Sequence, residues 1–186
     1  MGTAVELNSV YYTWPGMKTA ALHVPNFSVE TGSRVFLLGA SGSGKSKLLN
    51  LIAGLTVPPS GSVTVLGEEV QNMSGRSRDR FRARNIGFIF QQFNLVPYLD
   101  IETNIKLAAH LAGTPARTCH DRIPALMESL LLGSSLLKQR ADRLSVGQQQ
   151  RVAIVRAMIN EPKLIIADEP SSALDEESRS EFVELL

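Results

Sequence analysis

The sequence contains few of the features that mark secreted, membrane-spanning or nucleic-acid-binding proteins. It has a single cysteine, Cys119, so no disulfide can form within the chain, and a reducing compartment suits it. No apolar run approaches the ~20 residues that a membrane-spanning helix needs, and the first residues lack the charged-then-apolar pattern of a signal peptide. We therefore expect no direct membrane insertion, and any membrane role requires a partner.

The sequence also lacks an excess of either charge, since the formal net charge is +1. So small a net charge gives no overall basic field, and we expect no nucleic-acid partner. One local basic run exists, for which a solvated face beside a strand is favoured over a phosphate-binding patch. Its residues are Arg76, Arg78, Arg80, Arg82 and Arg84, with Asp79 among them.

The pattern of apolar residues predicts two α/β parts separated by a helical insert. Residues 103–137 are rich in leucine and alanine at helical spacing, and Pro115 and Pro124 are expected to divide them into two or three short helices. This order indicates a parallel-sheet α/β core interrupted by a helical subdomain. Strands are predicted at residues 5–10, 22–29, 34–38, 62–65, 86–90 and 163–167, and further helices at 45–55, 145–160 and 176–186.

A glycine-rich loop lies between the predicted strand 34–38 and the predicted helix 45–55, and it fits the phosphate-binding pattern G-x-x-x-x-G-K-[ST]. Glycines let such a loop turn its backbone N–H groups inward, and the helix start adds the positive end of its dipole. Lys45 is expected to reach the β- and γ-phosphates of a nucleotide, and Ser46 to offer its hydroxyl to Mg²⁺. The loop consists of Gly39, Ala40, Ser41, Gly42, Ser43, Gly44, Lys45 and Ser46.

Two adjacent carboxylates, Asp168 and Glu169, end the predicted strand 163–167. Paired acids at the end of a buried strand are costly unless a cation offsets their charge. We assign Asp168 to Mg²⁺, directly or through water, and Glu169 as the general base that polarises the water attacking the γ-phosphate. A solvated acidic turn is the alternative, and the phosphate loop in the same chain argues against it.

A second helix start that suits an anion is predicted near residue 145. Ser145, followed three residues later by Gln148, is a capping-box pattern, which marks a helix N-terminus. Because helix N-termini attract anions, two such starts in one chain suggest a nucleotide held between two helix ends. The same residues also fit an ordinary capped helix.

Together these motifs resemble those of the ABC transporter ATPase family. The resemblance spans almost the whole chain and keeps the family's order of motifs. Residues 87–97, GFIFQQFNLVP, are most similar to the lipoprotein-release, macrolide-export and cell-division branch. The corresponding motifs are Walker A at 39–46, the Q-loop at 90–92, the signature at 144–148, Walker B at 164–168 and the D-loop at 172–175.

The resemblance implies a P-loop NTPase (RecA-like) core over residues 1–91 and 144–186, with an N-terminal antiparallel β part. It implies a helical subdomain over residues 92–143 that docks a membrane permease. The activity would be ATP + H₂O → ADP + phosphate, coupled to that permease at the cytoplasmic, inner face of the cell membrane. Gln91 would contact Mg²⁺ and the attacking water.

The resemblance further implies a head-to-tail homodimer with two ATP molecules at its interface. Each ATP would lie between Walker A of one subunit and the signature of the other, where Ser145, Val146, Gly147 and Gln148 stand. The family also places an aromatic residue ahead of the phosphate loop, where it stacks on adenine. Spacing places this residue at Trp14, with Tyr11 and Tyr12 as rivals and a plain core aromatic as the alternative.

Three features depart from the family pattern. Val146 stands where glycine is usual, and Lys47, counted with the nucleotide-binding residues, stands where threonine is usual. The family's switch histidine, expected at a strand end after the D-loop, has no counterpart before Leu186, so we expect a chain cut short at its C-terminus and an impaired ATPase. The alternative interpretations are an ABC ATPase outside transport and a regulatory nucleotide-binding module without turnover.

Overall fold

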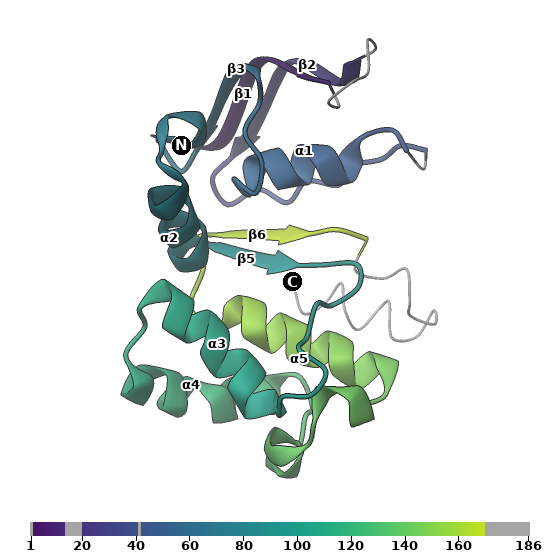
Figure 1. The fold of residues 1–186 in the computed structure, drawn as a ribbon, viewed down its shortest axis with the longest axis vertical. Coiled ribbons are helices and arrows are strands. Elements are labelled where there is room, and N and C mark those ends of the chain that lie inside the picture. Colours follow the sequence, from purple (N-terminus) through teal and green to yellow (C-terminus); the bar gives the residue numbers. More distant parts are fainter. Residues whose placement is uncertain (1, 14–19, 41, 170–186) are drawn as a thin grey trace. The chain divides into compact units, whose positions relative to one another are not determined.

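The structure is a computed structural model that describes residues 2–13, 20–40 and 42–169. The chain forms two compact units, Met1–Arg82 and Ala83–Leu186. The first contains an antiparallel sheet and the second a parallel strand pair with helices (Figure 1). The mixed α/β fold with an antiparallel part is thus confirmed, whereas the subdomain boundaries at residues 92 and 143 stay a prediction.

The sheet of the first unit is antiparallel and has the order β2-β1-β3-β4. Helix α1 (Lys45–Ile52) lies along this sheet (Figure 1) and contacts β3. Alternate apolar side chains of the sheet, such as Leu7 and Val63, are fully buried, and so is Leu51 of α1. The strands are β1 (Thr3–Thr13), β2 (Ala20–Glu30), β3 (Ser60–Val65) and β4 (Glu68–Glu69), and the 3-10 helix η1 (Val70–Asn72) follows them.

A bulge in β1 decides which aromatic side chains face the core. Ser9 has a φ of 50°, and the register between β1 and β3 shifts there. Gly61 passes so close that a Cβ on it would lie 2.4 Å from the Ser9 carbonyl oxygen, which excludes any larger residue. After the bulge Val10 is buried, Tyr11 is 46% exposed and Tyr12 is half-buried, so Tyr12 shares the inner face with Val10.

The predicted strand at residues 34–38 is wrong. These residues belong to neither sheet of the described part of the chain, and Leu38 is 94% exposed. An apolar run becomes a strand only where another strand supplies hydrogen bonds, and the strands of the first unit pair among themselves instead. A turn precedes this stretch, in which the Ser33 amide donates to the Glu30 carbonyl oxygen (3.2 Å).

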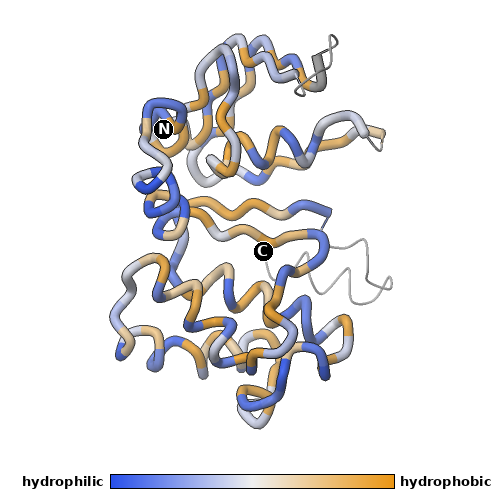
Figure 2. The backbone as a smooth tube through the Cα atoms, viewed as in Figure 1, coloured by the Kyte–Doolittle hydropathy of each residue, from blue (hydrophilic) through white to orange (hydrophobic). Residues whose placement is uncertain are grey.

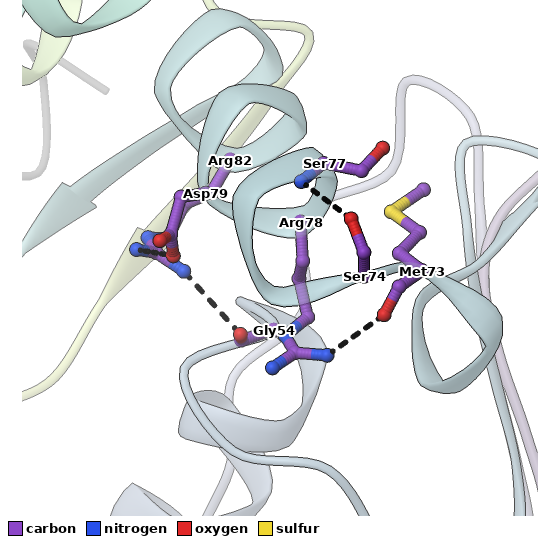
Figure 3. Close-up of polar contacts among 7 residues, drawn as sticks. All are labelled: Gly54, Met73, Ser74, Ser77, Arg78, Asp79 and Arg82. Carbon is purple, nitrogen blue, oxygen red and sulfur yellow. Dashed lines mark hydrogen bonds and ion pairs between the residues drawn. The ribbon is translucent and has the colours of Figure 1, made fainter.

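The basic run forms helix α2 (Gly75–Asn85), which the sequence did not predict because polar residues carry no apolar periodicity. None of its residues is buried, as expected for a solvated face. Two of its arginines nevertheless hold it in place (Figure 3). Arg78 donates to the Met73 carbonyl oxygen (3.2 Å), and Arg82 donates to the Gly54 carbonyl oxygen (3.3 Å) just after α1.

The second unit is built on a parallel pair of short strands, β5 (Ile86–Ile89) and β6 (Leu164–Ala167). Both strands are hydrophobic over most of their length (Figure 2), as expected for a strand pair covered by other elements. Helix α5 (Val146–Met158) packs on β5. A Cβ on Gly87 would lie 2.7 Å from the Ala157 carbonyl oxygen, so this close packing requires glycine.

The leucine- and alanine-rich stretch is helical, as predicted. It forms α3 (Ile101–Ala112), α4 (Ala116–Ser129) and the 3-10 helix η2 (Ser134–Lys138), and η3 (Ala141–Arg143) follows. Pro115 separates α3 from α4, where it is the N-cap of α4. None of the described helices has the length and apolar character needed to cross a membrane.

The predicted helix break at Pro124 is wrong, because Pro124 lies inside α4. A proline there removes one backbone hydrogen bond and crowds the preceding turn. Cys119, Ile123 and Met127 are buried at four-residue spacing on both sides of it. The packing of this continuous apolar row therefore offsets the lost hydrogen bond.

Glu102 makes two ion pairs, one within α3 and one that ties α3 to η2. Its carboxylate is paired with Lys106 on the same helix and with Lys138 Nζ (2.6 Å) in η2. Hydrogen bonds from Lys106 and then Lys138 lower the pKa of Glu102 from 4.5 to about 2. The carboxylate is therefore favoured in the folded state.

Glu102→Gln is expected to lower the free energy of unfolding by about 1 kcal/mol at pH 7, because both ion pairs are lost. The folded pKa lies below the unfolded value, so this contribution is complete above pH 4.5 and disappears as the pH falls through about 2. Urea unfolding of wild type and variant at neutral and acid pH measures it, with Glu128→Gln, at an exposed position of α4, as the control. A wild-type advantage of equal size at pH 7 and at pH 2.5 would contradict the assignment.

Candidate functional site

The phosphate loop has the glycine-dependent shape that the sequence predicted. Gly42 and Gly44 have left-handed φ values of 80° and 93°, which residues with a Cβ rarely adopt. A Cβ on Gly39 would lie 2.7 Å from Ser43 Oγ, so a larger residue would collide with the loop itself. Ser41 lies outside the described residues.

Positive charge gathers where this loop enters α1. Lys45 Nζ donates to the carbonyl oxygens of Gly39 (2.9 Å) and Ala40 (3.1 Å). Gly44 is the N-cap of α1 and gives no side-chain cap, and the first turn, which includes Ser46, has no acidic residue. Because this turn contains no carboxylate that would neutralise the positive end of the helix dipole, the loop fits the phosphate groups of a nucleotide.

One of the three candidate aromatic residues contacts the first turn of α1. The Lys47 ammonium lies 3.4 Å from the centroid of the Tyr12 ring, which is a cation–π contact. Tyr11 instead packs on His23, with ring centroids 4.1 Å apart. Trp14 lies outside the described residues. Lys47, the departure from the usual threonine, therefore links Tyr12 to the phosphate loop.

The carboxyl ends of β5 and β6 bring together three predicted site residues. The Asp168 amide donates to the Ile89 carbonyl oxygen (3.0 Å), which extends the strand pairing by one residue. Gln91 Nε2 then donates to Glu169 Oε2 (3.2 Å), although 78 positions separate the two residues. Glu169 is exposed and has a φ of 45°. It therefore lies beyond the end of β6, where the backbone has left the extended conformation of the strand.

The chemistry of this edge suits a hard cation. Carboxylate and amide oxygens of Asp168, Glu169 and Gln91 are donors of the kind that Mg²⁺ accepts. The described residues contain no cluster of three or more His, Cys, Asp or Glu side chains that could hold a metal ion. A metal ion here would therefore complete its shell with other oxygens, such as a serine hydroxyl, water or phosphate.

Ser145 begins α5 with the predicted capping box. Its Oγ accepts from the Gln148 amide (3.2 Å), and Gln148 Oε1 accepts from the Ser145 amide (3.0 Å). The Val146 side chain is 51% exposed, and a Cβ on Gly147 would meet nothing within 4 Å. The first turn of α5 is therefore open, as an anion-binding helix start requires. The D-loop at residues 172–175 lies outside the described residues.

Two side chains that the motifs did not predict hold the loop at residues 92–100. Arg156 of α5 donates to the carbonyl oxygens of Phe93 and Asn94, both at 2.5 Å. Asn104 of α3 is buried and makes four hydrogen bonds with the backbone farther along this loop. Contacts to backbone carbonyls leave no sequence pattern. The available signals were a polar or charged residue among apolar ones, namely Arg156 in the predicted helix 145–160 and Asn104 in the leucine- and alanine-rich stretch.

Comparison with known proteins identifies the family. Residues 22–172 match the ABC transporter family. The chain is 42% identical to an ABC transporter ATP-binding protein of Thermotoga maritima, over 100% of this chain and 80% of that protein. It is 41% identical to the macrolide export ATP-binding/permease protein MacB of Brucella melitensis, over 89% of this chain but 25% of that protein.

The solved structures agree with the sequence relatives. A dimeric structure of the ATP-binding cassette MJ0796, in a post-hydrolysis state bound to ADP and Pi, matches with a TM-score of 0.88 and 33% identity. The match covers 97% of this chain and 80% of that chain. With the phosphate loop, the carboxylate edge and the capped signature helix all present, the chain belongs to the ABC transporter family, of which it is a nucleotide-binding domain.

Proposed function

We propose that this chain binds ATP with Mg²⁺, hydrolyses it to ADP and phosphate, and couples that reaction to a membrane permease. The observation that supports hydrolysis, and not binding alone, is the pairing of Gln91 with Glu169 at the carboxyl ends of β5 and β6. An amide beside a carboxylate suits a water molecule that must be both oriented and deprotonated.

Nucleotide binding rests on the loop ahead of α1. Lys45 exchanges the carbonyl oxygens that it now contacts for phosphate oxygens, because a charge-assisted bond to phosphate is the stronger one. Ser46 offers its hydroxyl to Mg²⁺. For adenine we propose Trp14, since Lys47 already covers one face of Tyr12 and His23 packs on Tyr11.

Hydrolysis uses the edge formed by Gln91, Asp168 and Glu169. When bound through Ser46, Asp168 and Gln91, Mg²⁺ supplies charge that offsets the β- and γ-phosphates. Glu169 accepts a proton from the attacking water as the water oxygen bonds to the γ-phosphorus. The bond between that phosphorus and the oxygen of ADP breaks, and Gln91 holds the water in line.

Assembly follows from the open start of α5. A helix N-terminus with an exposed first turn suits the γ-phosphate of an ATP held by a second copy. We infer a head-to-tail homodimer in which Ser145, Gly147 and Gln148 of one copy face the phosphate loop of the other, and the dimeric cassette with ADP and Pi supports it. The helical residues 92–143 would dock a permease at the cytoplasmic face of the membrane. The combined ATP-binding/permease name of the Brucella relative supports a permease partner.

Lys45→Ala is expected to weaken Mg²⁺–ATP binding at least ~100-fold, or about 2.7 kcal/mol, because the main side-chain charge on the phosphates is lost. Equilibrium titration with a fluorescent ATP analogue measures the affinity. Lys163→Ala, which removes an exposed lysine outside the loop, is the matched control. Equal affinities of the two variants would refute the assignment of the phosphate loop.

Glu169→Gln is expected to lower the rate of phosphate release about 100-fold or more while ATP affinity changes little, because the proton acceptor is lost but the amide keeps the shape. With ATP and Mg²⁺ the variant should accumulate as a dimer in light scattering. Glu161→Gln is the control, since Glu161 is exposed and pairs with Arg122. Turnover at the wild-type rate in Glu169→Gln would show that another group takes the proton.

A further inference from the structure

The segment just after Gln91 has an unusual backbone. Phe93 and Asn94 are consecutive residues with φ values of 56° and 50°, and neither is glycine. Left-handed backbone is disfavoured for residues with a Cβ, and it persists only where the surroundings impose it. Both residues stay in a tight turn, in which the Phe93 amide donates to the Phe90 carbonyl oxygen (3.0 Å) and the Asn94 amide to the Gln92 carbonyl oxygen (2.6 Å).

The guanidinium of Arg156 binds the carbonyl groups of both residues of this turn. Its two terminal nitrogens donate to the carbonyl oxygens of Phe93 and Asn94, both at 2.5 Å. The planar fork of an arginine can hold two adjacent carbonyls at once, which the single ammonium of a lysine does less well. The Arg156 side chain is half-buried, and burial lowers its pKa. The two carbonyl oxygens are polar partners that offset part of the cost of burying its charge.

We infer that Arg156 is a positioning residue for ATP hydrolysis, which fixes Gln91 by holding the Phe93–Asn94 turn. The inference rests on the proposed function. Gln91 lies between Phe90 and Gln92, whose carbonyl oxygens are the acceptors of the turn. The turn fixes the backbone on both sides of Gln91, and from this position the Gln91 side chain donates to Glu169.

The far end of the same loop is held separately. Asn104 receives a hydrogen bond from the Val96 amide (2.7 Å) and donates to the Val96, Leu99 and Asp100 carbonyl oxygens. Loss of Arg156 should therefore loosen the turn beside Gln91 and leave the loop beyond Val96 in place. Arg156 also lies on α5, the helix that Ser145 caps, so one rigid helix carries both the signature residues and the support of Gln91.

The test compares Arg156→Lys and Arg156→Met with Arg122→Met in the full chain. Arg122 is the matched control, because its guanidinium also binds a backbone carbonyl near the end of α5, that of Ile159 (3.1 Å), but does not touch the loop. The measurements are thermal stability, amide hydrogen exchange at Phe93, Asn94 and Val96, and kcat and KM for ATP. Hydrogen exchange reports on the turn even if the chain proves not to hydrolyse ATP, so it separates this inference from the proposed function.

We expect amide exchange at Phe93 and Asn94 to speed up about tenfold in Arg156→Lys and more in Arg156→Met, with the amide of Val96 unchanged. We expect kcat to fall about tenfold to 100-fold in the same order while KM changes less than about threefold, since a displaced catalytic group costs rate and not binding. Arg122→Met should change neither. Slow exchange at Phe93 and Asn94 in both Arg156 variants, or an equal fall of kcat in Arg122→Met at equal loss of stability, would overturn the inference. If Arg156→Met does not fold, Arg156→Lys decides.

Discussion

The parallel pairing of β5 with β6 is the interaction on which the second unit depends. Parallel strands end at the same edge, so the pairing brings Gln91 to Glu169 across 78 positions of sequence. The pair is short and apolar, and it is stable only when other elements cover it. Helix α5 covers β5 closely enough that Gly87 admits no Cβ, which makes a single glycine a requirement of the whole edge.

Helix α5 also positions functional residues at both of its ends. Its first turn is capped by Ser145 and stays open to solvent, while Arg156 near its other end holds the turn beside Gln91. The helix is rigid because Val152 and Val155 are fully buried in the core that it forms with α3 and α4. The position of Gln91 and the position of the signature residues are therefore set by one packed element.

The sequence-based predictions are correct where a structural feature has a local cause and wrong where it depends on residues far apart in the sequence. The phosphate loop and the capping box of Ser145 were predictable, because glycine conformation and a three-residue hydrogen-bond spacing are local properties. The strand at 34–38 was predicted wrongly, because an apolar run does not say whether a neighbour supplies hydrogen bonds. The break at Pro124 failed for the related reason that side-chain packing across the proline outweighed its local cost. The role of Arg156 was hidden, because its partners are carbonyl groups that every residue has.

Lys45 and Arg156 show how one kind of contact serves opposite purposes. Each places a cation on two backbone carbonyl oxygens. The ammonium of Lys45 sits on a flexible stem at distances of 2.9 and 3.1 Å, in a loop whose helix end carries no acidic residue, so a phosphate can displace those carbonyls. The guanidinium of Arg156 is half-buried and binds two adjacent carbonyls of a turn with positive φ values. Loss of these contacts would leave a partly buried charge without them and would also release the turn. On the proposed function, the Lys45 contacts are those that phosphate oxygens replace, whereas the Arg156 contacts stay in place because they hold the turn beside Gln91.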